Sequence, residues 1–159
     1  LPILQMIVLG TGDWNYEEAF RQAQNQYPGR FAAHMMYSPN LSTAIYGGAD
    51  LFLMPSISEP CGLSQMIAMR YGTIPVVRET GGLRDSVVPY NKFTGEGTGF
   101  SFANINVQEM TGVLSEAVNL YHNEPKAWKA LQKNAMTADF SWEKSAKAYE
   151  EIYGWVTGK

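Results

Sequence analysis

The sequence predicts an α/β fold, in which a parallel β-sheet carries helices on both faces. Three observations lead to this prediction. Short apolar runs alternate along the chain with longer segments of helical period. Turns rich in glycine, proline or serine follow most of the apolar runs. The runs themselves are nearly continuous in apolar residues, which is typical of strands buried on both faces of a parallel sheet.

Length and composition favour one folded domain over residues 1–159. Domains cluster near ~100–150 residues. Of the residues of the chain, 45% are hydrophobic and 13% aromatic, which suffices for a core that needs no disulfide or metal. The net charge of −3 and the pI near 5.4 argue against nucleic acid as a partner. The apolar runs are too short to cross a bilayer and no signal peptide is visible, so we expect no membrane partner and a cytoplasmic location.

Cysteine and histidine usage excludes two further classes of site. Cys61 is the single cysteine, so no intramolecular disulfide can form. His34 and His122 are far apart in sequence, and no Cys/His group has metal-ligand spacing. We therefore expect no metal and no cofactor.

Each element of the first third follows from a local pattern. Residues 3–9 are an apolar run that ends at a Gly-Thr-Gly-Asp turn, which predicts a mostly buried strand. Residues 17–27 have helical composition and end at Pro-Gly. Residues 31–36 are a second strand candidate, and 42–46 predict a short helix before two glycines. Residues 51–54 predict a buried strand that ends at Pro-Ser.

The middle third continues the alternation. Residues 63–71 predict a helix ended by glycine. Residues 74–78 predict a strand, and the proline near its start indicates strand pairing that tolerates a missing N–H donor. A Thr-Gly-Gly turn leads into a short helix over 83–87. Residues 92–98 contain Thr-Gly-Glu-Gly and predict a surface loop, and 99–102 predict a brief strand.

Three helices are expected in the last third. Asn106 and Glu109 have capping-box spacing before an apolar stripe that reaches Tyr121. Pro125 fits the first turn of the next helix. Residues 142–156 place aromatic and aliphatic side chains on one face of a C-terminal helix, for which core packing is the default expectation.

Three turns rich in small residues follow predicted strands, at residues 10–12, 56–62 and 80–82. They would gather at one edge of a parallel sheet, where ligands bind. Glycine lets a ligand approach the backbone, and helix N-termini offer free N–H groups to a phosphate. The 10–12 turn lacks the third glycine of a dinucleotide motif, and an ordinary tight turn explains it.

Glu59 stands directly before the helix predicted at 63–71. By spacing alone it could be a solvated acid that interacts favourably with the helix dipole. The 80–82 turn weakens that interpretation, because one loop would then offer a carboxylate and amides to hydroxyls while the other offers amides to a diphosphate.

Four segments together closely resemble the bacterial glycogen synthases and plant starch synthases. They are Pro-Ser-Ile-Ser-Glu-Pro-Cys-Gly-Leu-Ser-Gln at 55–65, Met-Arg-Tyr-Gly-Thr-Ile-Pro-Val-Val at 69–77, Thr-Gly-Gly-Leu-Arg-Asp-Ser-Val at 80–87, and Asp-Phe-Ser-Trp at 139–142. The resemblance extends over nearly the whole chain.

This resemblance implies a retaining glycosyltransferase of the two-domain GT-B type, of which the chain is most of the Rossmann-like C-terminal half. In that family glucose moves from ADP-glucose, or UDP-glucose in some members, to the non-reducing end of an α-1,4-glucan. The implied partners are ADP-glucose, the glucan acceptor and the N-terminal domain of the same enzyme. Because that domain and the opening strand of the C-terminal half are missing, we expect no synthase activity from this chain alone.

The resemblance also assigns roles to the residues that match the family's donor-sugar motif. Glu59 matches the acid beside the donor sugar and is the expected catalytic residue. Cys61, Gly62 and Leu63 match the loop whose amides meet the sugar hydroxyls. Gln65 matches a motif position, but no role follows for it.

The remaining assignments concern the nucleotide. Thr80, Gly81 and Gly82 match the loop that holds the diphosphate. Tyr37 matches an aromatic that stacks on the adenine, although an aromatic at a strand end can also be packing alone. Ile67 stands where related families have a ribose-binding acid, and Glu79 where members often have a basic residue, so neither contact transfers.

Alternatives remain open at the level of sequence. Retention suggests same-face attack through an oxocarbenium-like state, with a covalent intermediate on Glu59 as the alternative. Cys61 as a nucleophile would need a base, and no histidine is near it in sequence. A stand-alone nucleotide- or sugar-binding module without catalysis is the alternative function.

Overall fold

The computed structural model describes residues 4–158, which form two compact units that meet in sequence at Ala49 and Asp50. Every strand pair within the units is parallel, and helices flank the strands. The predicted α/β class is therefore confirmed. The expectations of one continuous sheet and of one domain over 1–159 stay predictions.

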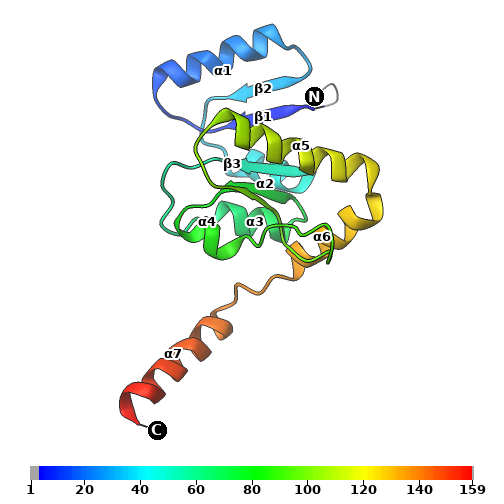
Figure 1. The fold of residues 1–159 in the computed structure, drawn as a ribbon. Helices are drawn as coiled ribbons and strands as arrows, with labels where there is room; N and C mark the ends of the chain where they lie inside the picture. The colour runs from blue at the N-terminus through cyan, green and yellow to red at the C-terminus, as the bar shows by residue number, and fades with distance from the viewer. Residues whose placement is uncertain (1–3, 159) are drawn as a thin grey trace. The chain divides into compact units, whose positions relative to one another are not determined.

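The first unit is a two-stranded parallel sheet with two helices. Its elements are β1 (Met6–Leu9), α1 (Trp14–Gln26), β2 (Phe31–His34) and α2 (Pro39–Gly48). Met6 of β1 lies opposite Phe31 of β2. Helix α1 packs along the sheet (Figure 1), where the ring of Phe20 stacks on that of Phe31 at a centroid distance of 6.0 Å.

The N-termini of both helices are set by capping side chains that the sequence analysis overlooked. Asp13 accepts a hydrogen bond from the Asn15 amide at 2.9 Å and starts α1. Ser38 accepts one from the Leu41 amide at 3.3 Å, and Pro39 opens α2. The predicted starts at 17 and 42 were therefore three residues too late.

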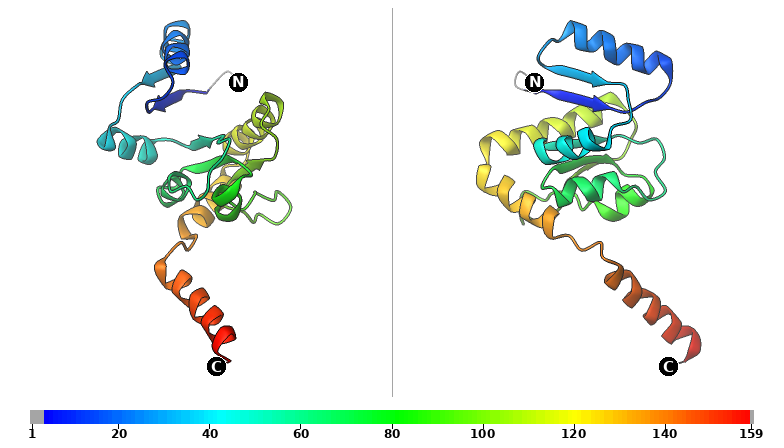
Figure 2. Two further views of the ribbon diagram at one scale, coloured as in Figure 1. Left: turned by 90° about the vertical axis from the view of Figure 1, so that its left-hand side faces the viewer. Right: turned by 180° about the vertical axis from the view of Figure 1, so that it is seen from behind.

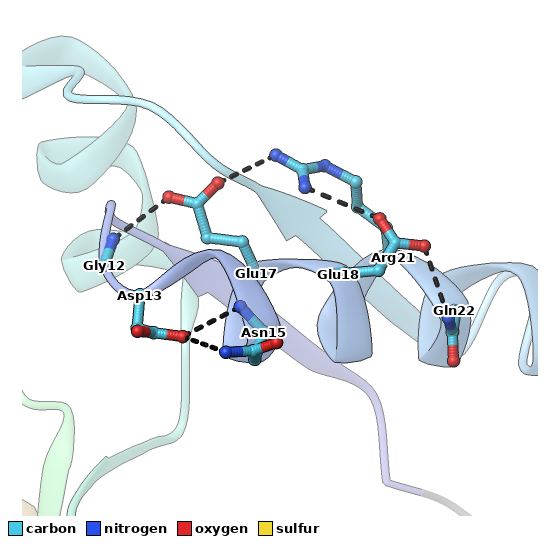
Figure 3. A network of polar contacts seen from close by, with 7 residues as sticks. All are labelled: Gly12, Asp13, Asn15, Glu17, Glu18, Arg21 and Gln22. Carbon is cyan, nitrogen blue, oxygen red and sulfur yellow. Dashed lines mark hydrogen bonds and ion pairs between the residues drawn. The ribbon is translucent and has the colours of Figure 1, made fainter.

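The turn at residues 10–12 is tied to the first turns of α1 (Figure 3). The Gly12 amide donates to Glu17 Oε1 at 3.0 Å, and Arg21 donates to Glu17 Oε2 at 2.8 Å. The hydrogen bond from the Gly12 amide, followed by that from the Arg21 side chain, holds the pKa of the Glu17 carboxyl below its usual value. These contacts favour the interpretation of 10–12 as a tight turn that anchors a helix.

The second unit contains a three-stranded parallel sheet with β4 at its centre. Its elements are β3 (Leu51–Met54), α3 (Ser64–Arg70), β4 (Ile74–Arg78), α4 (Gly81–Ser86), β5 (Phe100–Phe102), α5 (Val107–Asn123), α6 (Pro125–Thr137) and α7 (Trp142–Thr157). The strand order is β3-β4-β5. Helices α3 and α4 lie on one face of this sheet and α5 on the other (Figures 1 and 2).

The buried core belongs to the second unit. Its residues come from β4, β5 and four of the helices: Met69, Ile74, Val76, Val77, Leu83, Val87, Phe100, Ala117, Leu120, Trp128, Leu131 and Ala135. The rings of Tyr121 and Trp128 meet edge to face at 5.2 Å, which joins α5 to α6. This core holds β4 rigidly, and β4 leads into the candidate site.

Two expectations about burial were wrong. Met6 and Ile7 of β1 are 37% and 39% exposed, because within its unit β1 pairs with β2 alone; Ile3, where that strand was expected to begin, lies outside the described residues. The C-terminal helix exists as α7, but none of its residues is buried, and Trp142 and Trp155 are 86% and 81% exposed. In the part of the chain that the structure describes, no helix is both long and apolar enough to cross a membrane.

Candidate functional site

Two loops leave the carboxyl ends of neighbouring strands in the second unit. The β3–α3 loop comprises residues 55–63. The β4–α4 turn is defined as residues 79–82, that is, the two residues between β4 and α4 together with the first two residues of α4. Met54 at the end of β3 lies opposite Val77 near the end of β4, and the two strands are parallel. The loops therefore leave the same edge of the sheet, as the sequence analysis predicted for the 56–62 and 80–82 segments.

Glycine lets these two loops touch through their backbones. The Gly82 amide donates to the carbonyl oxygens of Glu59 at 3.1 Å and Pro60 at 3.2 Å. A Cβ atom on Gly81 would collide with the Glu59 carbonyl, and one on Gly82 would collide with the Cys61 carbonyl. Glu59 and the β4–α4 turn are thus parts of one local structure, and both glycines are sterically required there.

Three consecutive amides of the β3–α3 loop are available to a ligand. The N–H groups of Cys61, Gly62 and Leu63 donate to no acceptor within residues 4–158. Gly62 has φ +77°, a conformation that favours glycine, and Leu63 precedes α3 without a side-chain cap. Cys61 and Leu63 are exposed and Glu59 is half-buried. This arrangement can donate hydrogen bonds to hydroxyl or phosphate oxygens beside a carboxylate.

The β4–α4 turn offers fewer free amides than its sequence suggested. The Gly82 amide is used by the neighbouring loop, and the Thr80 amide donates to the Arg78 carbonyl at 2.9 Å. The Gly81 amide has no acceptor within residues 4–158, and Thr80 makes no side-chain capping bond. The assignment of Thr80, Gly81 and Gly82 to a diphosphate stays a prediction, in which Gly82 also has a structural function.

Arg78 is a residue of this site that the sequence analysis did not single out. Its Nη1 atom donates to the Ile57 carbonyl at 2.8 Å and to the Ser56 carbonyl at 3.3 Å. Its buried Nε atom has no partner within residues 4–158. In the sequence, Arg78 is distinguished as a cationic residue at the end of an apolar strand. Its hydrogen-bond partners lie more than twenty residues earlier in the chain, so no local pattern identifies them.

The structure shows what surrounds Glu79 and Tyr37. The Glu79 carboxylate accepts a hydrogen bond from Ser101 Oγ of β5 at 2.7 Å. Tyr37 belongs to the first unit, follows β2 and is 88% exposed, so its ring is not a packing residue of that unit. Its assignment to the nucleobase stays a prediction.

A groove of about 610 Å³ begins at the same site. It is lined by Leu63, Met66, Ile67, Arg70 and residues 137–141, so it runs from the β3–α3 loop along α3. No group of three or more His, Cys, Asp or Glu side chains within residues 4–158 is placed to hold a metal ion.

Comparison with known proteins gives consistent results. The family model described as "Glycosyl transferases group 1" matches residues 2–137. Glycogen synthases from Lachnospira eligens and Streptococcus uberis are 51% and 53% identical over 150 residues, which is 94% of this chain and 31% of each relative. The catalytic domain of starch synthase IV from Arabidopsis thaliana, solved with ADP and acarbose bound, superposes with a TM-score of 0.83 at 37% identity, over 98% of this chain and 33% of that one.

The chain therefore spans about a third of the length of the curated relatives that it matches. The matched segment includes both loops of the candidate site, the parallel strands that carry them and all elements up to α6. The resemblance that the loop sequences indicated is confirmed by these matches. On the evidence of its sequence, its fold and the family model, the chain belongs to the glycosyl transferases group 1 family.

Proposed function

We propose that this chain is the nucleotide-sugar-binding part of a retaining glucosyltransferase. Its donor is ADP-glucose, and glucose passes to the non-reducing end of an α-1,4-glucan. One observation carries the proposal: the free amides of Cys61, Gly62 and Leu63 stand beside Glu59, on a loop that is hydrogen-bonded to the β4–α4 turn. Donors for sugar hydroxyls and donors for a diphosphate thereby share one sheet edge.

The relatives support the choice of substrate. Glycogen synthases are about half identical to the chain over nearly all of it, and the starch synthase IV structure contains ADP and acarbose. Because the chain spans a third of those relatives, the remaining groups of the active site belong to the partner domain of the same enzyme in this proposal. The isolated chain accordingly has no synthase activity.

The chemistry follows from the leaving group. When the bond between the glucose C1 atom and the diphosphate oxygen breaks, negative charge grows on the departing ADP and positive charge on the sugar ring. Prearranged N–H donors stabilise the first charge. The Glu59 carboxylate stabilises the second. The acceptor hydroxyl enters on the face that ADP leaves, forms the new bond to C1 and passes its proton to the departing diphosphate oxygen, so the configuration is retained. Glu59 is held at its backbone by the Gly82 amide.

The test is Glu59→Ala in the full-length enzyme. Loss of a charge that acts in the transition state should lower kcat by about 100-fold or more. Glu116→Ala is the matched control, because Glu116 is an exposed acid on α5. Glucan extension from ADP-glucose is measured together with the thermal unfolding of each variant. A folded Glu59→Ala enzyme with near-normal turnover would remove Glu59 from the mechanism.

A further inference from the structure

Gln65 is a buried polar side chain between the two loops of the site. It lies in the first turn of α3 and is 0% exposed. Its Nε2 atom donates to the Gly62 carbonyl at 2.9 Å and lies 3.2 Å from the Cys61 carbonyl. It also lies 3.0 Å from Ser86 Oγ at the end of α4. The two amide protons therefore serve the β3–α3 loop and α4 at the same time.

Ser86 extends this connection to the β4–α4 turn. Its hydroxyl accepts from Gln65 and donates to the Gly82 carbonyl at 2.6 Å. The Gly82 amide in turn donates to the carbonyl oxygens of Glu59 and Pro60. A closed chain of hydrogen bonds thus joins the loop that carries Glu59 to the turn that carries Gly81 and Gly82.

The orientation of the Gln65 amide is fixed by its neighbours. If its oxygen and nitrogen exchanged places, the oxygen would face two carbonyl oxygens, which cannot donate to it. In the observed orientation Oε1 is buried without a partner within residues 4–158 and points at Gly62, where a Cβ atom would lie 2.6 Å from it. The hydrogen bonds of Nε2 to the loop carbonyl and to Ser86 offset the cost of this unpaired oxygen, so the side chain contributes chiefly as a bridge between the β3–α3 loop and α4.

We propose that Gln65 is a positioning residue for glucosyl transfer, which holds the free amides of the β3–α3 loop at a fixed spacing from the β4–α4 turn through Ser86. The inference rests on the proposed function of these two loops. The leaving diphosphate and the glucose are bound by different loops, so their relative placement matters most when the bond between them breaks. A misplacement of about 1 Å can lower a rate by roughly 100-fold.

The test compares Gln65→Met, Ser86→Ala and the double variant in the full-length enzyme. Gln132→Met is the matched control, because Gln132 Nε2 likewise donates to a backbone carbonyl, that of Gly72, which precedes the amino end of β4. We expect Gln65→Met to lower kcat by about 10- to 100-fold, with the Kd for ADP changed less than about threefold, since base and diphosphate contacts remain. Ser86→Ala should change kcat in the same direction, and the double variant should add little to Gln65→Met.

A second readout does not depend on catalysis. Hydrogen exchange of peptides that cover residues 79–87 in the nucleotide-free enzyme should be faster in Gln65→Met and Ser86→Ala than in Gln132→Met. In both variants the chain of hydrogen bonds that runs from Gln65 through Ser86 to the Gly82 carbonyl is broken. If the wild type is active and the folded Gln65→Met and Ser86→Ala variants have the same kcat as the wild type, the positioning role is wrong. Hydrogen exchange at wild-type rates over residues 79–87 in these variants would overturn it as well. Absence of glucan extension by the wild type would instead overturn the proposed function, while the exchange data still decide whether Gln65 joins the loops.

Discussion

Gly82 has two functions in the backbone of the candidate site. Its amide donates to the Glu59 and Pro60 carbonyls, and its missing Cβ leaves room for the Cys61 carbonyl. Any larger residue must push the β3–α3 loop away from the β4–α4 turn. The position therefore links local sterics directly to the spacing of the ligand-binding amides.

Gly82→Ala should destabilise the chain by about 1–3 kcal/mol, the usual cost of forcing an extra methyl group into a closely packed place. Gly112→Ala is the matched control, because Gly112 lies in α5 with nothing within 4 Å of a Cβ atom. That change should stabilise the chain by up to about 1 kcal/mol, the difference in helix propensity. Urea unfolding measures both, and equal stability of the two variants would contradict the close approach of the loops.

Sequence alone could identify the residues of the site that carry local patterns. Glu59 and the amides of Cys61–Leu63 follow a strand and precede a helix, so their place at the sheet edge could be predicted. The contacts of Arg78 with Ile57 and of Gln65 with Ser86 both join residues 21 positions apart. Such pairs depend on how the strands align, which no local pattern specifies.

The N-terminus of α5 is capped by several hydrogen bonds to the Glu109 side chain. Glu109 accepts from the Asn104 amide at 2.8 Å, from Asn104 Nδ2 at 2.6 Å and from the Ala103 amide at 3.2 Å. Its own amide donates to Asn106 Oδ1 at 2.8 Å. The cap predicted at Asn106 is confirmed. The reciprocal bond of a capping box is absent within residues 4–158, because the Asn106 amide donates to the Asn104 carbonyl and the Glu109 carboxylate binds the Asn104 and Ala103 amides of the chain that leaves β5.

These bonds predict a pH dependence of stability. The Asn104 amide, followed by the Asn104 side chain, holds the pKa of Glu109 below its usual value of 4.5. A folded-state pKa that is lowered means stabilisation above pH 4.5, which is lost as the pH falls through the lowered pKa. Glu109→Gln should thus be less stable than the wild type at pH 7, and the difference should shrink in acid. Urea unfolding at pH 7 and in acid checks this, with Glu116→Gln as the control on the same helix. A difference in unfolding free energy between Glu109→Gln and the wild type that is the same at both pH values would contradict it.

The two middle strands could be predicted more closely than the starts of the first two helices. The bounds 51–54 and 74–78 agree with β3 and β4, because proline or glycine stands beside continuous apolar runs. The starts of α1 and α2 could not be obtained from apolar period, because Asp13 and Ser38 cap turns that are mostly polar. Pro75 lies in the central strand β4, a place that proline rarely occupies, and the strong burial of its neighbours outweighs the lost donor.

Residues 4–158 form two compact units, and the buried core lies in the second of them. The core and both loops of the candidate site lie in the second unit, while Tyr37 lies in the first. In the proposed function the second unit supplies the contacts to the sugar and the diphosphate, and the assignment of Tyr37 to the nucleobase stays a prediction. Aromatic side chains of α7, such as Trp142 and Tyr149, are exposed in this structure.

In the proposed function this chain binds a nucleotide sugar through its two loops. Calorimetric titration of the chain with ADP, ADP-glucose and UDP tests it most directly. We predict ADP binding with a Kd on the order of 0.1–1 mM, lost in Gly82→Ala and kept in Gly112→Ala. Failure of all three nucleotides to bind at millimolar concentration, with the chain folded, would contradict the account.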